Sequence, residues 1–217
     1  MSSSHPSNRS QRRSGSRGRA ALAAAAAATI IGATGAPALA DAPAPDPTPL
    51  TCGGQTIDRA APIHYRTEGV IAAPVDTVWN LQTDVARWPS WQAPVTSMRR
   101  LDDGPLQPNS RFRWTTPAPA TATTPATTLT ITSTVRQLEP NRCLRWTGPA
   151  VGDGMSIDGG THVWTFTPVP GGTLVRTEEN WNGAQVEADV ATSTRFLGAG
   201  LEAWISDLRK AAETPHR

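Results

Sequence analysis

The sequence predicts an α+β fold in which an antiparallel sheet surrounds one long helix near the C-terminus. Most of the chain before residue 187 alternates apolar and polar residues, which is the pattern of strands with one buried face. Strands in series with the helices grouped apart from them are typical of this class. Between Glu187 and Glu213, apolar residues recur at spacings of three, four and seven and so share one helical face, at Val190, Leu197, Leu201, Trp204, Ile205 and Leu208.

Two glycines, Gly198 and Gly200, fall inside this predicted helix. Because they lack a Cβ atom, they either kink the helix or let a strand or ligand approach it closely, and a merely tolerated pair is the remaining alternative. Arg209 and Lys210 suit the end of a helix, where cations interact favourably with the macrodipole. Pro215 marks the stop.

The first 40 residues have the composition of a secretory signal peptide. An arginine-rich start without acidic residues precedes an apolar run from Ala20 to Ile31, and Ala38-Leu39-Ala40 matches a cleavage site. The apolar run is too short for a membrane span, and the pair Arg12-Arg13 leaves the export route open between the general and twin-arginine pathways. We therefore expect export and cleavage after Ala40. The formal net charge then falls from +2 to −3, because five arginines leave and no acidic residue does, which removes any case for nucleic-acid binding.

We expect three parts along the chain: the signal peptide at residues 1–40, a proline-rich linker and N-terminal segment at 41–61, and one domain at 62–213. The domain opens with a strand at Ile63–Ile71 and a short helix that begins around Ala73-Pro74 and continues through Leu81. A second short helical or turn segment spans Thr83–Trp91. Further strands are expected at Val95–Leu101, Ser110–Thr115, Leu129–Leu138, Arg142–Thr147, His162–Thr167 and Leu174–Trp181.

Two segments between these strands are expected to be loops. Thr115 to Thr128 is almost entirely Thr, Pro and Ala, a composition that predicts an unpacked, mobile hairpin loop. Gly148 to Gly160 is rich in glycine, and a mobile gate over a cavity is a more natural role for it than an idle turn. Its glycines do not form a dinucleotide fingerprint, because the third spacing fails and no strand–helix context surrounds them.

The chain has two cysteines, Cys52 and Cys143. In an exported protein an even count favours a disulfide, which here would join the N-terminal segment to a strand. The alternative is one free buried thiol and one exposed thiol in a mobile tail.

Four motifs occur in order along residues 62–213. They are I-A-A-P-x-x-x-V-W-x-L-x-T-D at 71–84 with W-P-x-W behind it, L-E-P-x-R-x-L-x-W at 138–146, G-T-H-x-W-x-F-x-P at 160–168, and G-T-x-V-x-x-x-E-x-W-x-G at 172–183. In this order they resemble the START-like superfamily, also called SRPBCC, and within it the polyketide cyclase/dehydrase and lipid-transport branch. Asn109 departs from the glycine common in relatives, but asparagine tolerates the left-handed conformation that such a turn needs.

The resemblance implies a helix-grip fold, a curved seven-stranded sheet around the C-terminal helix with a cavity between them. Eight tryptophans against three phenylalanines and one tyrosine suit an apolar pocket with a few N–H donors, although the same rings could simply fill a core. By two-residue alternation and helical spacing, the inner wall is expected to contain Trp114, Trp146, His162, Trp164, Phe166, Thr177, Glu179, Trp181, Leu201 and Trp204.

His162 and Glu179 should lie on neighbouring strands and point inward. Such a pair could act as an acid and base, orient a polar group of a ligand, or form a satisfied ion pair, and we favour the last two over catalysis. By the same alternation Glu178 should face outward and be solvated, and Arg111, Arg113 and Arg145 should lie on the surface.

The sequence contains no nucleophile motif and no metal-ligand spacing, so we expect no metal and no cofactor. The leading hypothesis is an exported protein that holds a small hydrophobic molecule, such as a lipid or a polyketide-like compound. The alternatives are a cyclase or dehydrase, which export disfavours, and a stress or interaction module without a ligand. The sequence does not determine the ligand or the oligomeric state.

Overall fold

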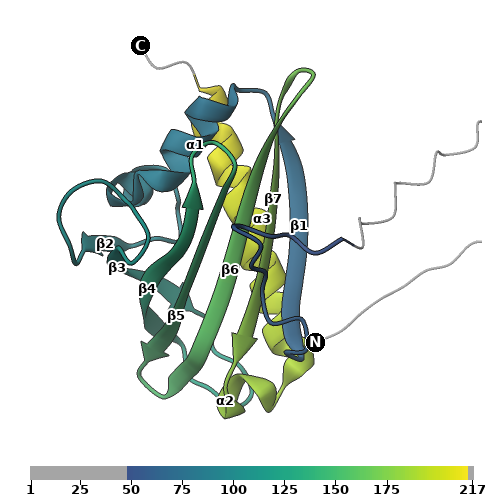
Figure 1. Ribbon diagram of the computed structural model, residues 1–217. Coiled ribbons are helices and arrows are strands. Elements are labelled where there is room, and N and C mark those ends of the chain that lie inside the picture. The colour runs from purple at the N-terminus through teal and green to yellow at the C-terminus, as the bar shows by residue number, and fades with distance from the viewer. Residues whose placement is uncertain (1–47, 215–217) are drawn as a thin grey trace, which may run out of the picture. The chain divides into compact units, whose positions relative to one another are not determined.

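The computed structural model describes residues 48–214, in which seven antiparallel strands form one curved sheet around a long helix (Figure 1). The predicted signal peptide and residues 41–47 of the predicted linker lie outside the described residues. The strand order is β1-β7-β6-β5-β4-β3-β2. The strands are β1 (Ile63–Ile71), β2 (Ser97–Arg100), β3 (Arg111–Ala118), β4 (Thr127–Glu139), β5 (Cys143–Gly152), β6 (Met155–Val169) and β7 (Gly172–Asn182), and the helices are α1 (Val75–Thr83), the 3-10 helix η1 (Val85–Ser90), α2 (Ala184–Glu187) and α3 (Val190–Glu213).

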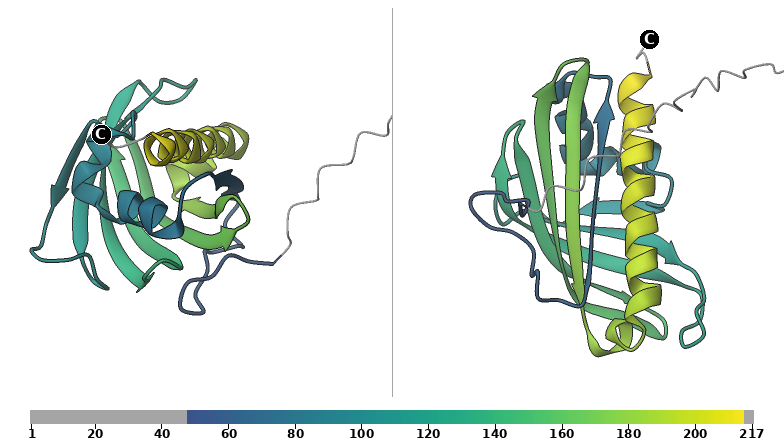
Figure 2. Two further views of the ribbon diagram at one scale, coloured as in Figure 1. Left: turned by 90° about the horizontal axis from the view of Figure 1, so that it is seen from above. Right: turned by 90° about the vertical axis from the view of Figure 1, so that its right-hand side faces the viewer.

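Helix α3 lies along the concave side of the sheet over most of its length (Figure 2). It begins three residues later than predicted, because Asp189 leaves the helical conformation and its carboxylate accepts the Thr192 backbone N–H at 3.0 Å. Its buried face contains Leu197, Gly198, Leu201, Trp204, Ile205 and Leu208. Among the described residues, no helix is both long enough and apolar enough to cross a membrane.

The prediction of a glycine-rich loop at 148–160 is wrong, because most of this segment belongs to a hairpin of β5 and β6. Only a tight turn at Asp153-Gly154 interrupts the strands, and Gly154 has a φ of +70°. Gly148 lies beside an irregularity in the β5–β6 register, and a Cβ there would come within 2.0 Å of the Thr132 carbonyl oxygen. Glycine at this position therefore serves close backbone approach between strands.

The predicted unpacked loop at 115–128 is also shorter and better packed than expected. Strand β3 continues to Ala118 and β4 begins at Thr127, and both Ala118 and Thr124 are buried. The Thr121 hydroxyl oxygen accepts the backbone N–H groups of Thr123 and Thr124, so the side chain closes the turn. Threonine is also a strand former, and its abundance here extends the strands. Asn109, in the preceding turn, adopts the expected left-handed conformation with φ of +73°.

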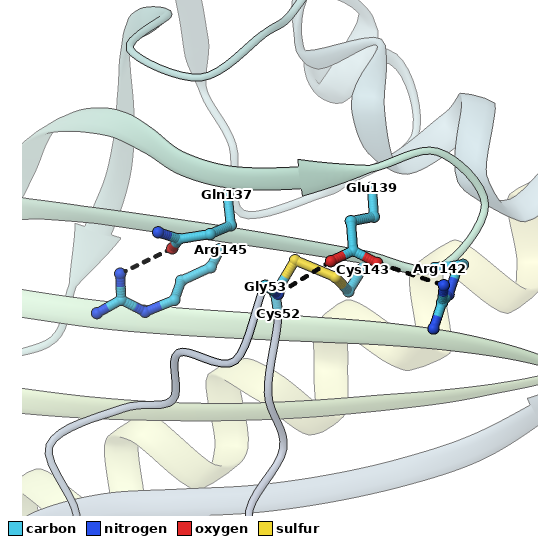
Figure 3. The surroundings of a disulfide bond; sticks show 7 residues. All are labelled: Cys52, Gly53, Gln137, Glu139, Arg142, Cys143 and Arg145. Atoms are coloured by element: carbon cyan, nitrogen blue, oxygen red, sulfur yellow. Dashed lines mark hydrogen bonds and ion pairs between the residues drawn. A yellow bond between two sulfur atoms is a disulfide. The ribbon is translucent and has the colours of Figure 1, made fainter.

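Residues 48–62 cross the face of the sheet that is turned away from α3 (Figure 2). We call this segment the strap. Leu50, Cys52 and Ile57 pack there with Cys143 and Val163 in a separate apolar cluster. A disulfide joins Cys52 to Cys143, with a Cα–Cα distance of 5.4 Å (Figure 3). Next to it, Glu139 accepts the Gly53 backbone N–H at 3.1 Å. The strap is thus tied covalently to the start of β5.

The strap overturns two expectations about the outer face. Glu178 points outward as predicted but is buried, and its carboxylate accepts the Leu50 backbone N–H at 3.2 Å and lies 4.0 Å from the Arg59 guanidinium. Arg145 is only partly exposed, because it donates to the Thr56 carbonyl and to Gln137, and burial lowers its pKa. Alternation correctly predicts the face of the sheet but says nothing of what covers it. Arg111 and Arg113, beyond the strap, are exposed as predicted.

Candidate functional site

A cavity of about 240 Å³ lies between the concave face of the sheet and α3. Its wall is mostly apolar, with Leu129 and Ile131 from β4 and Ile157 from β6. The resemblance implied such a cavity, and no residue of α1 or η1 lines it. Seven of the ten predicted wall residues line it, namely Trp114, Trp146, His162, Glu179, Trp181, Leu201 and Trp204.

The other three predicted residues, Trp164, Phe166 and Thr177, are buried but do not line the cavity. Phe166 packs edge-on against Trp79 of α1, with ring centroids 5.4 Å apart. Trp164 lies in the core behind Trp204, with ring centroids 5.8 Å apart. Two-residue alternation places these side chains on the correct face of the sheet, but it cannot tell which part of that face the helices occupy.

Several of the tryptophan N–H groups around the cavity are already used inside the protein. Trp204 donates to the Gln82 side chain and Trp114 to Ser133, both at 3.1 Å. Trp88, buried at the centre of the aromatic cluster, donates to the Gln82 carbonyl at 3.0 Å. The rings therefore present mainly apolar faces to a ligand, while their polar edges hold the walls in place.

His162 and Glu179 are register partners on β6 and β7, as predicted, and both line the cavity. His162 Nδ1 lies 3.1 Å from Glu179 Oε2, and Trp181 donates to Glu179 Oε1 at 2.9 Å. On its other side, His162 Nε2 lies 2.6 Å from Thr177 Oγ1. The imidazole is also packed between indoles, with Trp146 and Trp164 at centroid distances of 4.7 Å and 4.9 Å.

The hydrogen bonds of Thr177 link the tautomer of His162 to the proton on Glu179. When the Thr177 hydroxyl donates to the Val163 carbonyl at 3.2 Å, His162 Nε2 is the donor to Thr177. In a neutral ring, Nδ1 is then an acceptor, and the proton between it and Glu179 belongs to the carboxyl group. Thr177 does not touch the cavity, but this hydrogen bond favours the histidine tautomer that accepts from a protonated Glu179.

Burial favours the uncharged form of both groups. It lowers the pKa of His162 to about 3, because a buried imidazolium loses its hydration. Burial raises the pKa of Glu179 to about 7, and the hydrogen bond from Trp181 opposes this increase only in part. At a pH between these two values, the polar point in the cavity wall is therefore an uncharged acid–imidazole pair.

Sequence reasoning missed other residues of the wall. Gln92 follows η1 in an irregular segment, and Ser133 belongs to β4, whose threonine-rich pattern marks no functional position. The short loop around Thr121 and the α3 residue Phe196 also contribute. Only Phe196 could have been identified as a wall residue from the sequence, because it lies four residues before Gly200 on the predicted helix.

One group of potential metal ligands gathers in the described residues, made up of Cys52, Cys143 and Glu139. It lies at the strap and not in the cavity. Its two sulfur atoms are bonded to each other, so they do not act as thiolate ligands while the disulfide is intact.

A curved antiparallel sheet that holds a ligand-sized cavity against a C-terminal helix defines a helix-grip protein of the START-like class, and the predicted fold class is confirmed. A family model described as polyketide cyclase / dehydrase and lipid transport matches residues 62–213, and the chain belongs to this family. A comparison with curated protein sequences gives no match.

Solved structures share the fold at low sequence identity. TTHA0849 from Thermus thermophilus is 18% identical with a TM-score of 0.54, over 69% of this chain and 96% of that one. The di-domain ARO/CYC StfQ from the steffimycin biosynthetic pathway is 17% identical with a TM-score of 0.53, over 70% of this chain and 51% of its own. DynU16, from the dynemicin biosynthetic locus, is 19% identical with a TM-score of 0.50, over 70% of this chain. This chain spans about half the length of DynU16, with 47% of it covered. Because all of these identities are below 25%, the matches support the fold alone.

Proposed function

We propose that this chain is an exported protein that binds a small, uncharged, largely apolar molecule in the cavity under α3. The observation that carries the proposal is the cavity itself, with ring faces for walls and a neutral His162–Glu179 pair as a polar point. The family description, which includes lipid transport, agrees with an apolar ligand. Export is supported by the predicted signal peptide and by the disulfide, because disulfides persist mainly in oxidising compartments.

The charges around the cavity disfavour an anionic ligand. Among the described residues that line it there is no lysine and no arginine, so no cation is present to pair with a buried carboxylate or phosphate. Asp189 lies at the edge of the wall, but it is engaged by the Thr192 backbone N–H. An anionic ligand would lose its hydration without gaining a partner, which costs several kcal/mol.

The volume limits the ligand to a small molecule. A cavity of about 150 Å³ holds benzene, with six carbon atoms. By proportion, the cavity of about 240 Å³ holds roughly ten non-hydrogen atoms, the size of two fused rings. A whole phospholipid does not fit inside this volume.

Native mass spectrometry of the secreted, mature protein tests the proposal. We expect a bound molecule of low mass, either retained from the host or acquired from a total lipid extract, that is absent from the denatured spectrum. Ala150→Leu should abolish it, because Ala150 is a buried residue of the cavity wall and three added carbon atoms enter the empty volume. Ala199→Leu is the matched control, because Ala199 is exposed on α3 and does not line the cavity. No adduct in the wild type, or equal adducts in the wild type and Ala150→Leu, would contradict the proposal.

One observation favours a second candidate, an enzyme of the cyclase or dehydrase type. The protonated Glu179 and the imidazole of His162 both line the cavity, and a carboxyl group with a pKa of about 7 can donate or accept a proton near neutral pH. Glu179→Gln separates the two candidates, because the amide keeps the shape and the hydrogen-bond donor but cannot release its proton. Binding retained with turnover lost would support the enzyme.

A further inference from the structure

We propose that the indole N–H of Trp146 is a hydrogen-bond donor to the ligand, and that it selects molecules with an uncharged oxygen acceptor such as a carbonyl group. This inference rests on the proposed binding function and specifies the class of ligand. The alternation of the strands predicts that Trp146 lies in the wall, but it does not predict which atoms of the ring remain unpaired.

Four tryptophans line the cavity within the described part of the chain, and three of them use their N–H groups inside the protein. Trp114, Trp181 and Trp204 donate to neighbouring side chains at 2.9–3.1 Å. Trp146 is the fourth, and its Nε1 makes no hydrogen bond within residues 48–214. A buried N–H without an acceptor costs free energy, and such groups in proteins are nearly always paired.

The unpaired N–H of Trp146 is accessible from the cavity. The unpaired N–H groups of Trp91 and Trp164 are fully covered by protein atoms, whereas that of Trp146 is not one of the covered groups. Trp146 as a whole is only 4% exposed, and it lines the cavity on the side of the sheet that faces α3. An acceptor that reaches this N–H therefore belongs to the contents of the cavity.

Neighbouring rings fix the direction of this N–H. Trp146 packs against Trp88, Phe112 and Trp204, with ring centroids 5.8 Å, 6.0 Å and 6.4 Å apart. His162, its register partner on β6, lies against the same ring at 4.7 Å. A donor that is already oriented loses little conformational freedom when a ligand accepts its hydrogen.

The His162–Glu179 pair beside Trp146 offers no competing donor. Both imidazole nitrogens are engaged, Nδ1 with Glu179 and Nε2 with Thr177. The carboxyl group of Glu179 bonds to His162 through one oxygen and accepts the Trp181 N–H with the other. The pair is satisfied within the protein, so the N–H of Trp146 differs from it in having no partner of its own.

A carbonyl oxygen is the chemistry that suits this N–H. An indole nitrogen donates and never accepts, so its partner must be an acceptor. A hydroxyl oxygen also accepts, but it brings a hydrogen that needs an acceptor of its own. A carboxylate is disfavoured, because no lysine or arginine lines the cavity in the described residues. The ligand is thus a compact apolar molecule with a ketone, ester or similar oxygen next to Trp146.

The test compares 1-indanone with indane, two fused-ring probes of the expected size that differ in one carbonyl oxygen. Equilibrium dialysis against the disulfide-intact mature protein gives both dissociation constants, and their ratio is the preference for the ketone. Trp146→benzothienylalanine, introduced by nonsense suppression, keeps the bicyclic shape but has sulfur in place of the N–H. We expect the preference for 1-indanone to fall by roughly 2- to 12-fold in this variant, which corresponds to one hydrogen bond, while indane binds as in the wild type.

Nuclear magnetic resonance of the wild type, labelled isotopically at tryptophan, gives an independent readout. The Nε1–H resonance of Trp146 is identified by its absence from the benzothienylalanine variant. 1-Indanone should move this resonance downfield, because an accepted hydrogen bond deshields the proton. Indane should not move it downfield.

Trp114→benzothienylalanine is the matched control. Trp114 also lines the cavity, but its N–H donates to Ser133, so its loss should leave the preference for 1-indanone unchanged. An equal preference in the wild type and the Trp146 variant, or a Trp146 resonance that 1-indanone does not move, would overturn the inference about Trp146. The binding function would still stand, because both probes bind in that case. Failure of the wild type to bind either probe would overturn both.

Discussion

Replacing Gly200 by alanine should stabilise the protein, whereas the same change at Gly198 should not. Both glycines lie inside the unbroken helix α3, where alanine is favoured over glycine by about 1 kcal/mol. A Cβ at Gly200 meets no atom within 4 Å. The Gly200→Ala variant should therefore gain about 1 kcal/mol in the free energy of unfolding.

The surroundings of Gly198 reverse this gain. A Cβ there lies 2.8 Å from Cε2, 2.9 Å from Cζ and 3.0 Å from Cδ2 of Tyr65, while carbon atoms prefer separations of about 3.5–4.0 Å. The ring cannot turn away freely, because its hydroxyl donates to Glu202 of the same helix. Overpacking of this kind costs about 1–3 kcal/mol, so Gly198→Ala should be neutral or destabilised by up to about 2 kcal/mol.

Helix propensity contributes equally to both variants, so it cancels in the difference between their free energies of unfolding. The remaining difference, about 1–3 kcal/mol, comes from the contact with Tyr65 alone. Urea unfolding of the mature chain, followed by tryptophan fluorescence with the disulfide intact, measures this difference if the slopes of the transitions agree. Equal midpoints for the two variants would refute the close approach of α3 to β1. A Gly200→Ala midpoint below that of the wild type would refute the open space at Gly200.

Two further predictions concern the strap and the buried pair. The Cys52–Cys143 disulfide links residues 91 positions apart, so the Cys52→Ser/Cys143→Ser variant should lose roughly 4–5 kcal/mol in urea unfolding. A reducing agent should destabilise the wild type but not this variant, and an equal effect on both would contradict a structural disulfide. Glu179→Gln should fold with near-native stability at pH 5, because the amide can donate to His162 and accept from Trp181 as the protonated acid does. Since burial raises the pKa of Glu179 from 4.5 to about 7, the wild type should lose stability relative to this variant as the pH rises through that window. The lowered pKa of His162 makes stability rise with pH instead, but it is present in both proteins. If the difference in stability between the wild type and Glu179→Gln does not change with pH, that would contradict a protonated Glu179.

The order of elements could be predicted from the sequence because it depends on local patterns. The first strand, Ile63–Ile71, was predicted with its observed bounds, and the helical spacing from Leu197 to Leu208 identified the buried face of α3. The same local patterns failed where composition was misleading. Residues 115–128 and 148–160 were expected to be loops, but hydrogen bonds to neighbouring strands extend the sheet through much of both.

The sequence by itself determined the class of fold, the pairing of His162 with Glu179 and the inward direction of the tryptophans, because side-chain period and strand order are properties of the chain. Tertiary structure alone decided which inward residues meet the cavity. Trp164 and Phe166 share the parity of Trp146 and His162, but Trp204 and α1 pack against them. It also decided the environments of Glu178 and Gln92. The strap buries Glu178, and the turn after η1 places Gln92 in the cavity wall. Burial and unpaired hydrogen-bonding atoms depend on neighbours distant in the chain, and no spacing along the sequence encodes them.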